Sequence, residues 1–365
     1  MTMRERVPFM SLVPADDDAA IRGAVDRVLK RGWFILGPEV DAFEAEFAAA
    51  SGTSHAIGVG NGTDALALLL RAMGIGPGDE VVTSPTSAAF SALAIQMAGA
   101  TPVFADIDPE RLTLSPEAAA SAITARTAAI MPVHLYGQPA DMPAFLAIAR
   151  RHNLAIVEDA CQAHLATSDG KPVGTYGTGA GVSFYPTKNL GALGDGGAVI
   201  TNDAALADKL KRLRNGGQSE KYRHVEFGVN SRLDDLQAAI LRERLARLPQ
   251  WTSRRRALAG SYRRTIAHPS VSVPRECDPG HVYHLFPVLV PNRDGFQAHL
   301  KTNGVGTLVH YPHSLTAQSA FANAGGGACP IAERVAREVC SLPLHQHLSD
   351  SDLEFVAAAV NSWRG

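Results

Sequence analysis

A lysine within a glycine-rich segment is the side chain with the clearest chemical potential in this sequence. Lys188 lies in segment 184–189 (FYPTKN), directly after an apolar run. The glycines that follow it are Gly191, Gly194, Gly196 and Gly197. Desolvation of a lysine at the end of a sheet lowers the pKa of its amine, which makes the amine a nucleophile for Schiff-base formation. The alternative is an ordinary exposed lysine in a surface loop.

A second polar segment joins a predicted strand to a predicted helix. It spans residues 60–64 (GNGTD). Glycines permit a tight turn, and the free N–H groups of a helix N-terminus favour a phosphate there. The segment lacks both the G-K-[ST] ending of a Walker loop and the G-x-G-x-x-G spacing of a dinucleotide fold. The alternative is a plain turn in which Asn61 and Thr63 cap the helix.

Two acids end another apolar run. Glu158 and Asp159 lie in segment 154–160 (LAIVEDA). A buried carboxylate needs a partner, and a protonated pyridine nitrogen is a suitable one. The alternative is a helix-capping or salt-bridged acid. The phosphate cradle, the acid and the lysine each follow a strand of one predicted sheet, and together they form the three anchors that pyridoxal phosphate requires.

The elements that position these residues alternate between strands and helices. This alternation predicts βαβ units and a mostly parallel α/β sheet with helices on both faces. The predicted strands are 55–59, 80–84, 101–107, 127–137, 154–160, 179–186 and 197–202. The predicted helices are 63–73, 115–123 and 141–151.

The remainder of the chain predicts a second, smaller domain. A long amphipathic helix over 231–248 ends before Pro249, and another helix covers 254–266. Prolines and glycines then interrupt the chain, with later helices near 294–303 and 350–363 and a mobile loop at 324–328 (AGGGA). We therefore predict a large cofactor-binding domain over 1–250 and a small α+β domain over 251–365.

Composition excludes several classes of protein. The 365 residues are 46% hydrophobic and 19% charged, with a formal net charge of −2, which does not favour a nucleic-acid binder. No apolar run approaches the length of a membrane span, and the N-terminus lacks a signal-peptide pattern, so we expect a cytoplasmic protein. The four cysteines show no metal or disulfide spacing and are expected to be reduced. They are Cys161, Cys277, Cys329 and Cys340.

Histidine pairs and an arginine run allow rival interpretations. The pairs His281/His284, His310/His313 and His345/His347 lack the further ligands of a zinc site, so no metal is expected. Arg254, Arg255 and Arg256, with Arg263 and Arg264, form a basic run on a helix. We interpret this run as a solvated helix face or a dimer contact. The alternative is that its arginines contact a nucleotide diphosphate.

Taken together, these motifs resemble the DegT/DnrJ/EryC1/StrS family of sugar aminotransferases. The resemblance extends from about residue 33 to 345 and is most specific around Lys188. Matching segments include NGTDALALLLRAMGIGPGDEVV, AIVEDACQAH, SFYPTKNLGALGDGGAVITND and NSRLDDLQAAILR, with HVYHLF and VHYPHSL nearer the C-terminus. The family implies the aspartate-aminotransferase (fold type I) architecture.

The resemblance also implies roles for individual residues. Lys188 matches the lysine that carries pyridoxal 5'-phosphate, with pyridoxamine 5'-phosphate formed during turnover, and Asp159 matches the acid that pairs with the pyridine nitrogen. Gln162 matches a glutamine near the phenolic oxygen of the cofactor. Other matches in the cofactor site are Gly62, Thr63, Asp64 and Ser183; those in the nucleotide-sugar site are Tyr185, His310 and Tyr311.

The same resemblance implies a homodimer with shared active sites. Asn230 matches an asparagine that reaches the cofactor phosphate from the partner subunit. The sequence departs from the family pattern at Cys161, where alanine is usual, and at Leu165, where glycine is common. The aromatic residue expected over the cofactor ring is displaced, and Phe90 is a candidate for that place.

The implied activity is transfer of an amino group from an amino acid, expected to be L-glutamate, to a nucleotide-linked keto sugar. The nearest branch is that of the dTDP-3-keto-6-deoxyhexose aminotransferases. Dehydratase relatives carry histidine at the lysine position, so Lys188 favours transamination. Two alternatives remain: an inosose aminotransferase of aminocyclitol biosynthesis, and a regulatory protein that binds the cofactor.

Overall fold

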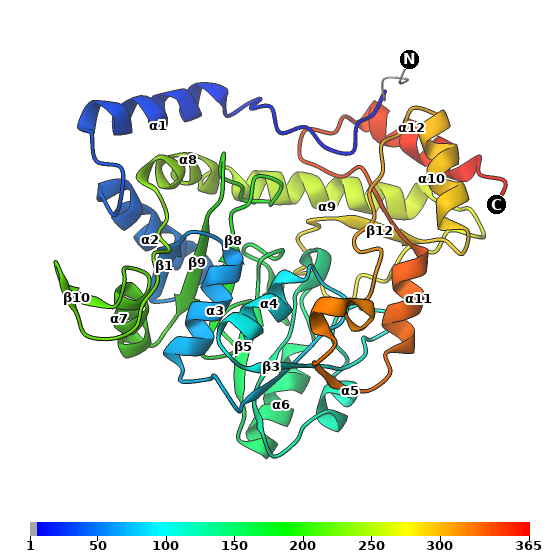
Figure 1. Ribbon diagram of the computed structural model, residues 1–365. Helices are drawn as coiled ribbons and strands as arrows, with labels where there is room; N and C mark the ends of the chain where they lie inside the picture. The colour runs from blue at the N-terminus through cyan, green and yellow to red at the C-terminus, as the bar shows by residue number, and fades with distance from the viewer. Residues whose placement is uncertain (1–5) are drawn as a thin grey trace.

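The centre of the molecule is an eight-stranded sheet, seen in a computed structural model that describes residues 6–365 (Figure 1). Its strand order is β1-β9-β8-β5-β4-β2-β3-β13. Strand β9 pairs antiparallel with β1 and β8, whereas every other neighbouring pair is parallel. The strands are β1 His55–Val59, β2 Glu80–Thr83, β3 Thr101–Phe104, β4 Thr127–Met131, β5 Ala155–Asp159, β8 Gly179–Ser183, β9 Gly197–Thr201 and β13 Gly325–Gly326. The expected mostly parallel α/β sheet is confirmed.

Helices pack on this sheet and extend beyond it. Helix α3 contacts β5, β8 and β9, α6 contacts β4 and β5, and α7 contacts β1. The helices of the N-terminal part are α1 Asp18–Arg31, α2 Pro38–Ser51, α3 Gly62–Ala72, α4 Phe90–Met97, α5 Pro116–Ser121, α6 Met142–His152, α7 Ala204–Leu213 and α8 Asp235–Leu245. Those that follow are α9 Leu248–Thr265, α10 Arg293–Thr302, α11 Pro330–Glu338 and α12 Asp350–Asn361.

Close packing of α3 on β8 brings the start of this helix to the sheet end. A Cβ atom at Gly181 would lie 2.6 Å from Leu66, and one at Gly179 would lie 3.3 Å from Leu69. Both leucines are fully buried. Glycine in β8 therefore lets the helix approach the sheet, and the N-terminus of α3 lies beside the end of β8.

The C-terminal part has its own apolar core. Residues of α9, α10 and α12 join the antiparallel pair β12 (Phe286–Leu289) and β14 (Val339–Leu342) in one buried cluster. Val7 from the N-terminal segment completes that cluster, and β13 joins the main sheet. The division at residue 250 stays a prediction. Segments cross between the two regions, since Val7 packs in the C-terminal cluster and β13 joins the main sheet.

Two expectations about local structure are wrong. Residues 231–234 are not helical: Ser231 bonds to Gly60, and Asp234 bridges to Ile35, so α8 begins only at Asp235. The first helix does end before Pro249, at Leu245, but α9 begins at Leu248 rather than at 254. Pro249 lies in the first turn of α9, where its missing N–H costs nothing.

The expected mobile loop at 324–328 is also wrong. Gly325 and Gly326 form β13, which pairs in parallel with Val103 and Phe104 of β3. A Cβ atom at Gly326 would lie 2.1 Å from the carbonyl oxygen of Phe104, and its φ is +117°. The glycines thus permit a close backbone pairing, rather than flexibility.

Three short strand pairs lie outside these elements or at their edges. They are β6 Thr167–Ser168 with β7 Lys171–Pro172, β10 Gln218–Glu220 with β11 Arg223–His224, and the β12–β14 pair. The hairpin β10–β11 projects from the body of the molecule beside α7 (Figure 1). Among residues 6–365, no helix is long and apolar enough to cross a membrane, and the four cysteines are free thiols.

Candidate active site

The N-terminus of α3 opens toward the ends of β5 and β8. Asn61 caps the helix, because its Oδ1 accepts the N–H of Asp64 at 2.8 Å. The N–H groups of Gly62 and Thr63 lie in the first turn and have no acceptor within the helix. They are therefore donors for an anion at the positive end of the helix dipole.

Close contacts make glycine necessary in this cradle. A Cβ atom at Gly62 would lie 2.8 Å from both the Sγ of Cys161 and the Cβ of Ser183. A Cβ atom at Gly197 would lie 2.3 Å from the carbonyl carbon of Asn61. The helix start, the end of β8 and the start of β9 thus meet with no room for side chains, which leaves backbone donors exposed at the surface of the cradle.

Asp159 ends β5 with its side chain 4% exposed. Its Oδ2 accepts the hydroxyl proton of Ser91 at 2.6 Å, and its Oδ1 accepts the N–H of Cys161 at 3.1 Å. Ser91 is held in turn by Ser87, whose hydroxyl oxygen lies 3.0 Å away. These contacts fix the orientation of the carboxylate at the sheet end.

Gln162 follows the end of β5 and forms hydrogen bonds with two tyrosines. Its Oε1 accepts the N–H of Tyr136 at 2.8 Å, and its Nε2 donates to the hydroxyl of Tyr311 at 3.0 Å. The hydroxyl of Tyr136 donates to the carbonyl of His310. Burial raises the pKa of Tyr311 to about 12, so its phenol stays protonated at neutral pH.

Lys188 lies in a tight loop between β8 and β9. Its N–H donates to the carbonyl of Tyr185 at 2.8 Å, and a Cβ atom at Gly191 would lie 2.5 Å from the carbonyl oxygen of Pro186. Burial lowers the pKa of the Lys188 amine, while the nearby Cys161 and Asp159 act in the opposite direction. Desolvation thus increases the fraction of neutral, nucleophilic amine.

Three histidines near Lys188 are neutral. Burial lowers the pKa of His164 to about 3 and that of His310 to about 4, and the positive Lys188 contributes to both shifts. Burial also lowers the pKa of His284 well below its usual value. His164 Nε2 lies 2.7 Å from the carbonyl oxygen of Ser183, at the end of β8. The surroundings of the lysine therefore hold imidazoles that add no positive charge at neutral pH.

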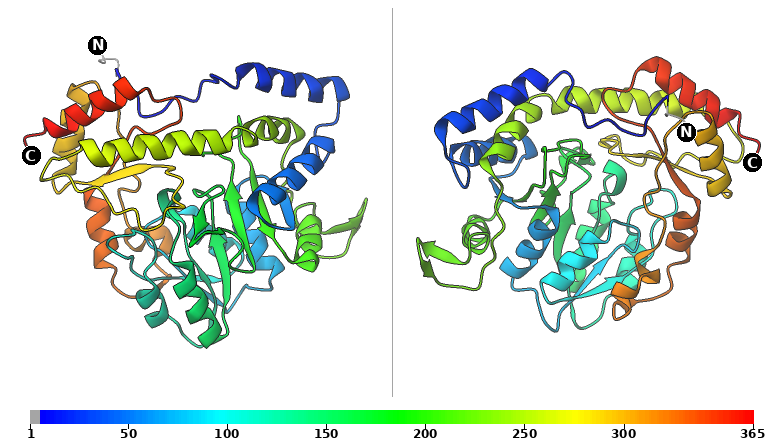
Figure 2. Two further views of the ribbon diagram at one scale, coloured as in Figure 1. Left: turned by 180° about the vertical axis from the view of Figure 1, so that it is seen from behind. Right: turned by 45° about the horizontal axis from the view of Figure 1, so that its top comes forward.

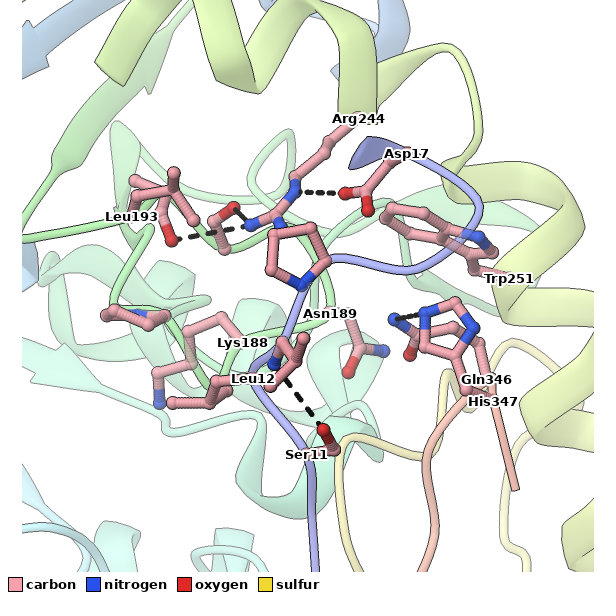
Figure 3. Close-up of a pocket in the computed structure, with 15 residues that line it drawn as sticks. Ser11, Leu12, Asp17, Lys188, Asn189, Leu193, Arg244, Trp251, Gln346 and His347 are labelled. Carbon is pink, nitrogen blue, oxygen red and sulfur yellow. Dashed lines mark hydrogen bonds and ion pairs between the residues drawn. The ribbon is translucent and has the colours of Figure 1, made fainter. Parts of the chain in front are cut away.

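A cavity of about 250 Å³ lies on one side of the Lys188 loop (Figure 3). Lys188, Asn189 and Trp251 are among the residues that line it. At its edge Asp17 Oδ2 accepts a hydrogen bond from Arg244 Nε at 2.7 Å, shown as a dashed line in Figure 3. The same arginine donates to the carbonyl of Gly191, which ties the N-terminal segment to the lysine loop.

Asp64 and Asn230 occupy different surroundings from the rest of the predicted site. The carboxylate of Asp64 accepts hydrogen bonds from Ser231 (2.6 Å) and Asn61 (3.1 Å), and its N–H is taken by the cap. These contacts occupy its N–H and orient its carboxylate toward Ser231, and a contact of Asp64 with the cofactor stays a prediction. Asn230 is exposed and precedes Ser231, whose hydroxyl accepts the N–H of Gly60 at 2.9 Å.

The structure shows the surroundings of two positions at which the sequence departs from the family pattern. Phe90 begins α4 with 60% of its surface exposed, whereas the next residue, Ser91, faces Asp159. A stacking role for Phe90 stays a prediction. Leu165 has φ +56°, a left-handed conformation that favours glycine, so the leucine is held there at a cost in backbone strain.

The basic run on α9 is divided, because Arg256 and Arg264 are exposed whereas Arg255 is buried. Arg255 is 3% exposed and donates to the carbonyls of Tyr283, His284 and Leu344. Arg254 forms an ion pair with Asp350 at 2.8 Å. For Arg255, the surface interpretation is wrong, because the guanidinium fastens the turn at 283–284 to the C-terminal part.

Comparison with known proteins decides the family. Residues 15–361 match the DegT/DnrJ/EryC1/StrS aminotransferase family. The chain belongs to this family. A relative from Streptomyces venezuelae, dTDP-3-amino-3,4,6-trideoxy-alpha-D-glucose transaminase, is 47% identical over 98% of this chain and 96% of its own length. The Saccharopolyspora erythraea protein named erythromycin biosynthesis sensory transduction protein EryC1 is 47% identical over 98% of this chain and 99% of its own.

A solved structure is equally similar. The crystal structure of S. venezuelae DesV in complex with a ketimine intermediate superimposes with a TM-score of 0.95, at 47% identity and 98% coverage of each chain. The protein is therefore an aminotransferase that depends on pyridoxal phosphate, and the predicted fold class is confirmed.

The residues of this aminotransferase fit that cofactor. The cradle offers two N–H donors where a Cβ would close the space, and the amine of Lys188 feels the charge of Asp159. The acid, the amine and the anion cradle thus meet at one end of the sheet, as three separate anchors of one planar molecule require.

Some contributors to the site were not predicted from the sequence. Ser91 bonds to Asp159, and Tyr136 bonds to Gln162. Ser91 gave no signal, because its contact with Asp159 joins residues from two separate elements, α4 and β5. Tyr136 gave no signal either, because its φ of +60° depends on the folded loop.

Proposed function

We propose that this aminotransferase moves an amino group from L-glutamate to a dTDP-linked keto-6-deoxyhexose. The observation that carries the amino transfer is the desolvated Lys188 beside Asp159 at the sheet end. The sugar nucleotide rests on the names of relatives, above all the S. venezuelae transaminase. Glutamate as donor rests on the family resemblance.

Pyridoxal phosphate supplies an electron-withdrawing ring that stabilises negative charge at the α-carbon of an attached amino acid. We assign the proton transfer at that carbon to the Lys188 amine, since burial lowers its pKa and so favours the neutral amine that can act as base and then as acid. Asp159 would pair with the protonated pyridine nitrogen of the bound cofactor. Gln162, which donates to the hydroxyl of Tyr311 at 3.0 Å, would lie near the phenolic oxygen, as the family resemblance implies.

The helix start and β8 hold the phosphate in this proposal. Gly62 and Thr63 donate their N–H groups, and the Ser183 hydroxyl, which already accepts the N–H of Tyr185 at 3.3 Å, has a proton to donate. Tyr185 is 52% exposed, and His310 lines the cavity beside Thr187; we place the sugar near these two residues. A single substitution at each of these residues would test the role proposed for it.

We also propose a homodimer with shared active sites. The segment that ends at Asn230 carries strongly exposed apolar side chains: Tyr222 is 82% and Phe227 is 84% exposed. Tyr222 lies at the tip of the hairpin, and Phe227 follows the hairpin with Arg71 over its ring. Exposed aromatic residues of this kind favour burial against another protein surface. The amide of Asn230, free of hydrogen bonds within residues 6–365, would then reach the phosphate of the partner's cofactor. A cytoplasmic location stays a prediction from the sequence.

A panel of acceptors tests the proposed activity. The holoenzyme and L-glutamate are incubated with dTDP- and UDP-linked keto sugars and with a keto inositol, and amino products are measured. We expect the highest kcat/KM with a dTDP-linked keto-6-deoxyhexose. Preference for the keto inositol would favour an aminocyclitol enzyme. Absence of transfer to every acceptor would favour the regulatory role, which the name of the S. erythraea relative suggests for that protein.

A further inference from the structure

The N-terminal segment forms a strap that is fastened at both ends. We use strap for residues 8–15. On one side Val7 pairs with Val305, and its N–H donates to the carbonyl of Gly304 at 3.0 Å. On the other side Asp17 pairs with Arg244 at 2.7 Å. The segment runs from the α12 end of the molecule across to α1 (Figure 2, right). Neither end of the strap is free to move alone.

An apolar cavity lies between the strap and the C-terminal part. Its volume is about 330 Å³. The strap supplies Pro8, Phe9, Met10 and Leu12, and the opposite wall is formed by Thr187, His284, Leu285, Leu308 and His310. Phe9 packs on His310, with ring centroids 5.7 Å apart. Both imidazoles are neutral at neutral pH, so the lining carries no charge.

This cavity adjoins the reacting end of the site. Thr187 is the residue before Lys188, and the charge of Lys188 acts on both His284 and His310. His310 is followed by Tyr311, which bonds to Gln162 at 3.0 Å. Leu12 lines both this cavity and the cavity that contains Lys188, so a sugar whose carbonyl carbon reaches Lys188 can place a more distant carbon against this wall.

The lining matches a particular part of a sugar. The strap side of the lining is apolar, whereas the polar side chains of Thr187, His284 and His310 lie on the opposite wall. A hydroxyl placed against the strap finds no side-chain partner there and costs free energy, so the strap favours carbon without oxygen. Leu12 is 53% exposed in the free chain and would bury apolar surface against a ligand. We propose that this cavity receives the deoxygenated carbon of the keto sugar, so that the strap selects 6-deoxyhexoses over sugars with a hydroxymethyl group.

This inference rests on the proposed function, and the test separates the two. Two acceptors are compared: a dTDP-linked keto-6-deoxyhexose and the same compound with a hydroxymethyl group. Discrimination of this kind by an apolar pocket amounts to roughly 10- to 100-fold in kcat/KM. The half-reaction with glutamate alone is followed by the near-visible absorbance of the holoenzyme, and it does not involve the sugar.

The variants are Leu12→Asn and Met10→Gln, assayed separately. Each keeps the shape of its side chain, and both positions are at least partly exposed, so the fold tolerates them. We expect the ratio of kcat/KM for the two acceptors to fall roughly tenfold, with an unchanged glutamate half-reaction. Leu12→Met should keep the wild-type ratio. Leu29→Asn is the matched control, because Leu29 is 57% exposed on α1, outside this cavity.

An unchanged ratio in both polar variants, with normal glutamate half-reactions, would overturn the inference. A wild-type enzyme that prefers the hydroxymethyl sugar would also overturn it. A wild-type enzyme that aminates neither acceptor would instead contradict the proposed function.

Discussion

The regions on the two sides of Lys188 differ in how the fold supports their residues. On the cofactor side, Asp159 and Gln162 are each 4% exposed and hydrogen-bonded at both polar ends, and they lie at strand ends of the central sheet. On the other side, the strap crosses between two fastened ends and leaves Leu12 and Val13 53% and 74% exposed. One region is supported by the central sheet, whereas the other is fastened at its two ends and packed in between through Phe9.

This difference in support predicts that the cofactor side carries the chemistry and that the strap carries the selectivity for the substrate. Groups that move protons must keep their geometry within fractions of an ångström, so they lie on supported elements with fixed partners. A wall that recognises a substrate tolerates wider variation, and a surface segment can change its side chains without disturbing the sheet. Substitutions on the cofactor side should therefore abolish turnover, whereas those at the strap should change substrate preference.

The largest loss is expected at Lys188. Lys188→Ala removes the amine that we assign to proton transfer, a contribution on the order of 10²- to 10⁴-fold. Steady-state amino transfer measures it, and binding of the cofactor is followed separately by absorbance. Lys171→Ala is the control, because Lys171 is exposed and lies over the ring of Tyr176. Equal activity of Lys188→Ala and wild type would contradict the assignment.

Asp159→Asn should cause a smaller but still large loss. Asparagine keeps an acceptor for Ser91 but loses the negative charge that holds a proton on the pyridine nitrogen. We expect kcat to fall roughly 100-fold, with a smaller change in the cofactor dissociation constant. Ser91→Ala, which only loosens the carboxylate, should lose roughly tenfold. If Asp159→Asn weakens cofactor binding but leaves kcat unchanged, the acid has no part in the chemistry.

The same contrast explains what sequence could predict. Strand ends follow from local apolar patterns, and parallel strands bring their ends to one edge, so Asp159 and Lys188 could be placed together. The N-terminal strap gave no such signal. Its position depends on Val7 pairing with Val305 and on Asp17 pairing with Arg244, contacts between residues more than two hundred positions apart. No local periodicity encodes such contacts.

Subunit complementation tests whether a residue of the second subunit completes the cofactor side of the active site. Lys188→Ala and Asn230→Asp, each inactive alone, are mixed and allowed to exchange subunits. If Asn230 acts across the interface, each heterodimer has one site with both native residues and one with both lesions. Random exchange should then restore ~25% of wild-type activity, because half of the dimers are mixed and each has one working site. Confirmed heterodimers without recovered activity would show that the site is not shared through Asn230.

The smallest effect is expected where the strap is fastened. Asp17→Asn removes the charge that partners Arg244, and both side chains are largely buried. Asparagine can still accept the hydrogen bond, so the expected cost is about 1–3 kcal/mol, a fall of several degrees in Tm. Because the strap lines the apolar cavity, the KM for the keto sugar should rise a few-fold while the glutamate half-reaction is unchanged. The adjacent Asp18→Asn is the control, since Asp18 pairs with Arg22 at the exposed surface, where such pairs contribute little. If Asp17→Asn slowed the glutamate half-reaction as much as it raised the KM for the sugar, the two sides of Lys188 would not be independent.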